Sequence, residues 1–249
     1  MLYIIIFIIL HLLLPFMTKS KGDENATGCP FTKKTVTGCP FTKKNITPCP
    51  ILNILMNMGL LDSKKEWTTQ NVQDALKKIQ LSELTSYLFA NSANRVLEMN
   101  NLSFSAKSLQ THDFIEHDAS MSRKDYNLGD HIHYNKKKFD LINKYFSNQK
   151  DITLKEFTEY RYYLYQKSIK ENANVNLGIK QYFSIGLETC AIFILLSEDD
   201  KLSLKKLRRV FEKETLDNVK INSINMPNYV TSYIKFTSYW FNASLRKNE

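Results

Sequence analysis

Three stretches of the sequence carry side chains whose types and spacing could do chemistry, and the first contains a repeated cysteine. Residues 27–50 repeat nearly the same ten residues three times, and each copy contains a Cys-Pro pair, at Cys29, Cys39 and Cys49. A tandem repeat is often only a duplicated linker, so the residues after each copy must distinguish the cysteines. Only the third copy continues into an apolar segment, PILNILMNMGLL, that is typical of a buried helix.

The second stretch is HDFIEHDASMSRKD, residues 112–125, in which five polar or charged side chains crowd together. They are Glu116, His117, Asp118, Ser120 and Arg123. Glu116 and Ser120 lie four positions apart, so on a helical turn their oxygen atoms would face the same way. Oxygen ligands at this spacing suit a hard cation such as Mg²⁺, although a structural loop with capping interactions would contain similar residues.

Two hydrolase interpretations of this segment are disfavoured, one by the spacing of its histidines and the other by a missing motif. His112 and His117 flank Glu116, but they lie five positions apart, which is about 140° around a helix of 3.6 residues per turn. Zinc peptidases of the inverted motif need two histidines four apart on one helical face, so the spacing argues against a shared metal. A Ser-His-Asp hydrolase is disfavoured because the sequence has no Gly-x-Ser-x-Gly motif.

The third stretch is an apolar segment, residues 183–196, with Glu188 in its middle. A helix that is apolar on nearly every face is buried on all sides. An unpaired buried carboxylate is costly, so Glu188 must be paired, protonated or facing a cavity. A salt bridge to a Lys or Arg of a neighbouring helix remains an equal alternative to a functional role.

The elements that would position these side chains are helical. The chain has 249 residues, 43% of them hydrophobic, with only 7 Gly and 6 Pro, and no run alternates with period two for more than a few residues. Helices are predicted over 50–59, 71–80, 82–99, 136–147, 153–171, 176–197, 203–214 and 227–241, and 114–135 is irregular. The sequence therefore predicts an all-α fold with a single domain.

The N-terminal segments differ in composition from this domain. Residues 1–20 begin with an apolar run of about fifteen and predict a signal peptide, with a retained membrane anchor as the weaker alternative. Residues 21–47 predict a flexible arm that contains the repeat, and 48–249 the folded domain. With a signal peptide removed, no transmembrane span is expected in the mature protein. Four Asn-x-Ser/Thr sequons add the expectation of a secreted glycoprotein; they lie at Asn25, Asn45, Asn101 and Asn242.

The net charge and the cysteine content indicate little about what the protein binds. The net charge of +9 permits attraction to anionic surfaces, through the basic arm for example, but a solvated surface is the simpler interpretation. The lysines are scattered without interleaved aromatic residues, so no specific nucleic-acid partner is expected. Four cysteines could form two disulfides in an oxidising compartment, although Cys190 lies in an apolar segment and suits a buried reduced thiol.

Two linked motifs resemble the haem-thiolate peroxidases and peroxygenases, the family of chloroperoxidase and the short unspecific peroxygenases. The family pattern Pro-Cys-Pro-x-Leu-Asn-x-Leu-x-Asn-x-Gly is similar to residues 48–59, and Glu-His-Asp-x-Ser-x-Ser-Arg is similar to 116–123. The likeness continues through 129–135, 186–188 and 211–216. Met58, where the family usually has His, and Asp217, where it has Pro, depart from the pattern.

The resemblance implies a chloroperoxidase-like domain that encloses a haem pocket and assigns Cys49 as the axial ligand of the iron of haem b. The positive end of the helix dipole would favour its thiolate. Thiolate ligation favours cleavage of the O–O bond of hydrogen peroxide. On the opposite side the family implies Glu188 and His117 as the acid-base pair. Asp118 is expected to orient His117, and burial to raise the pKa of Glu188.

The resemblance also implies a Mg²⁺ site, with Mn²⁺ as an alternative, formed by Glu116, Ser120 and the carbonyl of His117 beside a haem propionate. Arg123 would either bind the other propionate or brace its loop, and bracing is favoured.

The expected function is that of a secreted enzyme that uses hydrogen peroxide to oxygenate or oxidise small organic molecules or halides. The alternative is a catalytically inactive haem-binding or interaction protein of the same fold. Candidate pocket residues are Phe157, Tyr160, Leu164 and Phe183, although ordinary core packing is the simpler interpretation for each.

Overall fold

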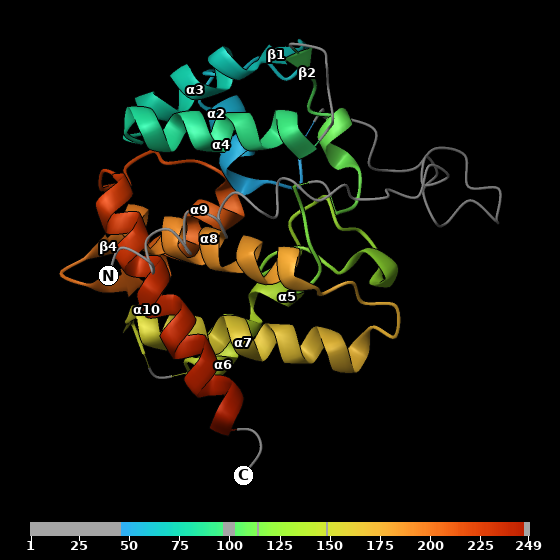
Figure 1. Cartoon of the computed structure of the whole chain (residues 1–249), viewed down its shortest axis with the longest axis vertical. Helices are drawn as coiled ribbons and strands as arrows, with labels where there is room; N and C mark the ends of the chain where they lie inside the picture. The colour runs from blue at the N-terminus through green and yellow to red at the C-terminus, as the bar shows by residue number, and fades with distance from the viewer. Residues whose placement is uncertain (1–45, 97–102, 114, 148, 247–249) are drawn as a thin grey trace.

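The helices of the protein form two groups that meet at one central apolar helix (Figure 1). The computed structural model describes residues 46–96, 103–113, 115–147 and 149–246. Its α-helices are α2 (Pro50–Asn57), α3 (Thr69–Lys78), α4 (Glu83–Val96), α5 (Lys136–Phe139), α6 (Leu141–Tyr145), α7 (Leu154–Glu171), α8 (Ile179–Leu196), α9 (Leu204–Lys213) and α10 (Met226–Leu245). The predicted all-α fold is confirmed.

The strands are short and serve to join helices. β1 (Trp67–Thr68) pairs with β2 (Ser103–Phe104), and β5 (Lys201–Ser203) lies between β3 (Asp151–Ile152) and β4 (Ser197–Glu198), all antiparallel. Elements of two or three residues leave no alternating pattern in the sequence, so they were not predicted.

Several helices begin where side chains satisfy the free backbone N–H groups of the first turn. Thr68 and Thr153 each form a reciprocal capping box, with Asn71 and Glu156 respectively. Asn225 caps α10, which has Pro227 in its first turn.

One predicted helix is wrong in its extent. Residues 136–147 form two short helices, α5 and α6, that meet at Asp140. The Asp140 carboxylate accepts hydrogen bonds from Lys136, Asn143 and Arg208. These side-chain contacts hold Asp140 at the junction of the two short helices.

Helix α8 is the centre of the fold. In Figure 1 it lies between α2–α4 on one side and α7 on the other, and α10 crosses α7 and α8. Among the described residues, α8 is the helix whose length and apolar composition would suffice to cross a membrane. Its 18 residues are 61% buried inside the protein, as expected for a core helix.

Gly186 permits the close crossing of α8 and α10. A Cβ atom at this position would lie 2.7 Å from ring carbons of both Phe236 and Tyr233. Both rings are buried, so neither can move aside without disturbing its own neighbours.

We therefore expect Gly186→Ala to lower the free energy of unfolding by about 1–3 kcal/mol, because it overpacks a filled contact. Denaturant unfolding followed by circular dichroism measures the change. Gly178→Ala, where the added Cβ would meet its nearest neighbour at 3.4 Å, is the control without a clash; as a change at the N-cap of α8 it should cost about 0.5 kcal/mol, less than Gly186→Ala. Equal stability of the two variants would contradict the packing argument.

Candidate active site

Cys49 lies at the start of α2, where the chain turns from an extended conformation into the helix. It is the N-cap residue, with φ −83° and ψ 116°, and Pro50 occupies the first helical position. Proline fits there because its fixed φ suits a helix and the missing N–H would have no partner in the helix. The Cys49 backbone N–H donates to Thr47 Oγ1 at 3.2 Å, and Asn53 N donates to the Cys49 carbonyl at 3.2 Å.

Asn53 holds the segment that precedes the cysteine. Its Oδ1 accepts from the backbone N of Thr47 at 2.9 Å, and its Nδ2 donates to the Thr47 carbonyl at 2.8 Å. The same Nδ2 donates to Oε1 of Glu214, just beyond α9, at 2.9 Å. The backbone at Cys49 is therefore held from both sides of the turn.

Arg123 continues this network into the polar segment 112–125. Its Nη2 donates to Glu214 Oε1 at 2.5 Å, its Nη1 to Ser122 Oγ at 2.6 Å and its Nε to the Ile132 carbonyl at 3.2 Å. The side chain is 1% exposed, and all three of its nitrogen atoms have partners in the protein. These contacts join Arg123 to Glu214 and to two residues of its own loop, and they are compatible with the bracing role that the sequence predicts for it.

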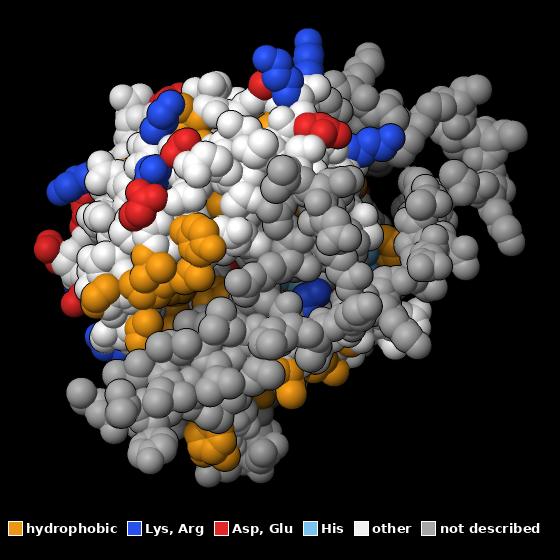
Figure 2. All heavy atoms as spheres, turned by 45° about the horizontal axis from the view of Figure 1, so that its top comes forward, with side chains coloured by type: hydrophobic (Ala, Val, Ile, Leu, Met, Phe, Trp, Pro, Cys, Tyr) orange, Lys and Arg blue, Asp and Glu red, His pale blue; other side chains and the backbone are white. Residues whose placement is uncertain are grey.

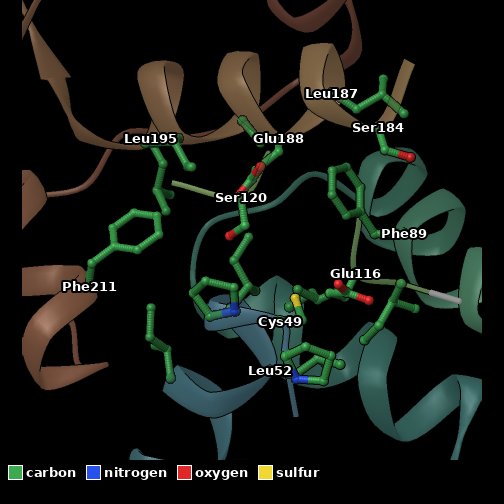
Figure 3. Close-up of a pocket in the computed structure, with 18 of the residues that line it drawn as sticks. Cys49, Leu52, Phe89, Glu116, Ser120, Ser184, Leu187, Glu188, Leu195 and Phe211 are labelled. Atoms are coloured by element: carbon green, nitrogen blue, oxygen red, sulfur yellow. The ribbon is translucent and has the colours of Figure 1, made fainter. Parts of the chain in front are cut away.

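A single cavity brings Cys49 and Glu188 together. It has a volume of about 240 Å³, and Figure 3 shows Cys49 and Leu52 on one side with Glu188 and Leu195 of α8 on the other. The remaining walls are mainly aliphatic and aromatic, with Phe89, Phe104 and Phe211 as the aromatic members. The cavity is thus an apolar space with a thiol and a carboxylate on opposing walls.

Glu188 is held by two cationic or hydrogen-bonding partners. Its Oε2 lies 2.7 Å from Arg161 Nη2, which comes from α7, and 3.5 Å from His117 Nε2. Arg161 is 1% exposed, and Glu188 is 26% exposed although it lies deep in the protein, because it lines the cavity. The carboxylate is therefore both in an ion pair with a neighbouring helix and facing a cavity, two possibilities that the sequence left open.

The expected protonation of Glu188 is corrected by these contacts. Burial raises its pKa, but the charge of Arg161, the hydrogen bond from His117 and the charge of Arg123 outweigh it and hold the pKa at about 2. The sequence predicted a raised pKa because the apolar helix was visible and the arginine was not. At neutral pH the group is a carboxylate.

The orientation of His117 also differs from the prediction. Its Nδ1 lies 2.6 Å from the backbone carbonyl of Asp118, and the Asp118 side chain does not contact the ring. The Asp118 carboxylate instead accepts from the backbone N of Tyr126 at 2.9 Å and of Asn176 at 3.1 Å, and from Asn172 Nδ2 at 3.3 Å. Asp118 therefore joins the loop to the start of α8, and its main chain orients the histidine.

The candidate cation ligands line the same cavity as Cys49. Glu116 and Ser120 are both in its wall, and Glu116 is 3% exposed. The Glu116 carboxylate lies 2.8 Å from His112 Nδ1, and His112, Glu116 and Asp118 offer ligand atoms within 4.8 Å of one another. Burial lowers the pKa of His112, but the hydrogen bond and charge of Glu116 outweigh it and raise that pKa. His112 and His117 thus face different acidic partners.

The thiol of Cys49 is affected by two opposing influences. Burial raises its pKa, whereas the backbone N–H groups of Leu52 and Ile51 and the charge of Arg123 lower it. Burial prevails, so the helix start favours the thiolate as expected but does not by itself produce it. Cys190, the other cysteine in the described part of the chain, is free and fully buried.

The pocket residues proposed from sequence lie elsewhere. Phe157, Tyr160 and Leu164 are buried in the core, and Phe183 packs against Tyr233, so none of the four lines the cavity. Sequence reasoning also missed Arg161 and Glu214. The sequence did contain a signal that Arg161 is buried. It lies four residues after Phe157, on a helical face whose other members are buried.

The comparison with known proteins agrees with this geometry. The fold and cavity define an all-α protein with a cysteine and a buried acid facing one another across an apolar pocket. The model of the family described as Peroxidase, family 2, matches residues 40–234, and the chain belongs to this family, the haem-thiolate chloroperoxidases and unspecific peroxygenases. Family membership implies a haem cofactor and a peroxidase activity. Comparison with curated protein sequences gave no match.

The ion pair with Arg161 leads to a test of the acid in the cavity. In Arg161→Gln the opposing charge is lost while burial and the contact with His117 remain, so we expect the pKa of Glu188 to rise clearly above its wild-type value of about 2. Infrared titration of the protonated carboxyl stretch, with Glu188→Gln to assign the band, measures the shift. Arg161→Lys, which keeps a positive charge, is the matched control and should retain a low pKa.

The same pair has a consequence for stability. Because the folded pKa is depressed, Glu188 stabilises the fold above about pH 4.5, and this contribution of about 3 kcal/mol is lost as the pH falls towards 2. Wild type should therefore lose more unfolding free energy than Glu188→Gln over this interval. A carboxyl band that titrates at the same pH in wild type and Arg161→Gln would contradict the assignment.

Proposed function

We propose that the protein is a secreted haem-thiolate peroxygenase or peroxidase in which Cys49 binds the haem iron and Glu188 transfers the proton of hydrogen peroxide. The observation that carries the proposal is the convergence of these two residues, 139 positions apart (188 − 49), on opposite walls of one cavity. A carboxylate without such a role would be cheaper to replace by an apolar side chain in this environment.

The residues present fit a haem. The walls between Cys49 and Glu188 are predominantly apolar, as a macrocycle requires, and a thiol is the only sulfur ligand among the described residues that line the cavity. The bound haem would supply oxidising chemistry, with electron donation from the thiolate favouring cleavage of the O–O bond. The backbone N–H groups of Ile51 and Leu52 would stabilise the Cys49 thiolate once metal binding has displaced its proton.

Glu188 would move the proton. At neutral pH it is a carboxylate whose Oε1, the oxygen not engaged by Arg161 and His117, would accept the proton of hydrogen peroxide. Its low pKa makes it a weak base but, once protonated, a strong acid that would release the proton to the departing oxygen. Arg161 and His117 would hold it in position throughout. The apolar walls would exclude water and accept small organic substrates.

Glu116 and Ser120, together with the carbonyl of His117, would bind Mg²⁺ at the edge of the cavity. Two observations support this site. Carboxylate, hydroxyl and carbonyl oxygens are ligands that suit this cation, and both side chains line the cavity wall. His112 would have to yield its contact with Glu116 to the ion. Elemental analysis of the haem-loaded protein should find Mg²⁺ in wild type and less of it in Glu116→Gln.

Secretion rests on the sequence features alone. The apolar segment 1–20 and three of the four sequons lie outside the described residues, and Asn242 is exposed on α10. On the face shown in Figure 2 the described basic side chains are interspersed with acidic ones, as expected of a solvated surface. Sequencing the N-terminus of protein recovered from culture medium tests cleavage after the leader.

The axial ligand can be tested by spectroscopy. We expect the ferrous carbon monoxide complex of the haem-loaded protein to show the red-shifted Soret band of thiolate ligation, and Cys49→Ala to lose it. Cys190→Ala is the matched control, because it removes the other described thiol and should leave the band unchanged. Loss of the band in Cys29→Ala or Cys39→Ala, with Cys49→Ala unaffected, would refute the assignment.

The proton-transfer role can be tested by kinetics. Glu188→Gln should lower the rate of peroxide-dependent oxidation of a small phenol by about 10²–10⁴-fold, because the amide cannot accept the proton. Glu198→Gln, at an acid outside the cavity, should retain the wild-type rate. Unchanged turnover in Glu188→Gln would remove the acid-base role, and a wild type that binds haem without turnover would support the inactive haem-binding alternative.

A further inference from the structure

A row of aromatic side chains runs along α10 away from the cavity. Its members, called the aromatic column here, are Tyr229, Tyr233, Phe236 and Trp240, which are 4%, 3%, 0% and 8% exposed. Their spacing of four, three and four residues places them on one face of the helix. At 1.5 Å per residue the column extends over roughly 16 Å.

The inner end of the column touches the cavity wall. The Tyr229 hydroxyl donates to the carbonyl of Leu187 at 2.8 Å, and its ring meets that of Phe89 edge to face at 6.0 Å. Leu187 and Phe89 both line the cavity, and Figure 3 shows them on the side of Ser184. Tyr229 is thus separated from the cavity by a single layer of side chains.

Ring contacts resume four residues further along α10, at Tyr233, and continue towards the surface. The ring centroids of Tyr233 and Phe236 are 5.9 Å apart, and those of Phe236 and Trp240 are 5.4 Å apart. Trp240 in turn meets Tyr162 at 5.2 Å and Tyr165 at 5.3 Å, both on α7. Tyr165 is half-buried, and its hydroxyl lies at the edge of the fold near the Leu177 carbonyl. The path therefore ends at an oxidisable side chain that reaches solvent.

Packing alone does not account for the tyrosines. The buried hydroxyl of Tyr233 has no hydrogen-bond partner among the described residues, and an unpartnered buried hydroxyl costs free energy that Phe would avoid. A phenylalanine at this position would fill the same space. A buried polar group of this kind calls for an explanation other than stability, and a redox role is one such explanation.

We propose that the aromatic column conducts electrons from the surface at Tyr165, through the buried Trp240, to the cavity, so that the protein also oxidises phenolic donors too large to enter. This inference rests on the proposed function, because hydrogen peroxide reacting at the cavity is the oxidant. One hydrogen peroxide takes two electrons and two protons and becomes two waters. Two phenols at the surface each lose one electron through the column and one proton to solvent, and the two phenoxyl radicals couple.

The experiment compares a bulky donor with a small one. Tyramine coupled to dextran cannot enter a cavity of about 240 Å³, whereas free tyramine can approach it. Haem-loaded wild type with hydrogen peroxide should couple both, giving dityrosine fluorescence, and without a donor should give a tyrosyl signal in electron paramagnetic resonance. Tyr165→Phe and Trp240→Phe should lose the dextran reaction and the part of the tyrosyl signal that Tyr165 carries, while retaining oxidation of free tyramine and any signal from Tyr229 and Tyr233.

The matched control is Tyr163→Phe. Tyr163 lies on the same helix as Tyr165 and is 36% exposed, but its ring contacts Tyr145 and Tyr160 rather than the column. It should behave as wild type. Tyr165→Phe removes only one oxygen atom, so it keeps the test valid if Trp240→Phe is unstable.

Four results would overturn the inference, the last of them together with the proposed function. The first is equal coupling of dextran-bound tyramine by wild type, Tyr165→Phe and Trp240→Phe, and the second is loss of free tyramine oxidation in parallel with the dextran reaction. Oxidation of free tyramine by a wild type that shows neither a tyrosyl signal nor dextran coupling would refute the column and leave the proposed function intact. Failure of wild type to consume peroxide with free tyramine would refute both.

Discussion

The buried carboxylate of Glu188 is the constraint on which the arrangement of the site depends. A charge in the middle of an apolar helix is tolerated only if another buried group compensates it, and Arg161 and His117 do so from two other segments. The helix α7, the helix α8 and the loop after Glu116 must therefore meet at one point. The cavity lies where they meet, and the carboxylate faces into it.

A second buried network fixes the opposite wall. Glu214 accepts hydrogen bonds from Asn53 and Arg123, so the helix that begins at Cys49 is joined both to the end of α9 and to the polar loop. Glu214 adopts φ +47°, a left-handed conformation that is rare for a side chain of this kind. The surrounding contacts evidently outweigh that local strain, as is common at functional sites.

Burial raises the pKa of both reactive groups, but the net shifts of the two pKa values have opposite directions. Cys49 has backbone donors and a distant charge, which do not offset burial, and the pKa of its thiol is raised. Glu188 has an arginine in direct contact, and its pKa falls to about 2. Between these groups the walls are mainly apolar, with the polar side chains of Glu116, His117 and Ser120 gathered in one part of the lining. On the far side of α8, Gly186 admits the rings of α10 and brings tyrosines close to that wall.

The sequence by itself determined the helical fold, the helix start at Cys49 and the polar loop, because these depend on local periodicity, caps and motif spacing. It also placed Glu188 in a buried helix and favoured a bracing role for Arg123. Only the tertiary structure decided which groups compensate Glu188, that the main chain rather than the side chain of Asp118 orients His117, and which aromatic residues line the cavity. These depend on contacts between residues far apart in the chain, such as Arg161 with Glu188 and Glu214 with Asn53, and no local pattern specifies the partner of a buried charge.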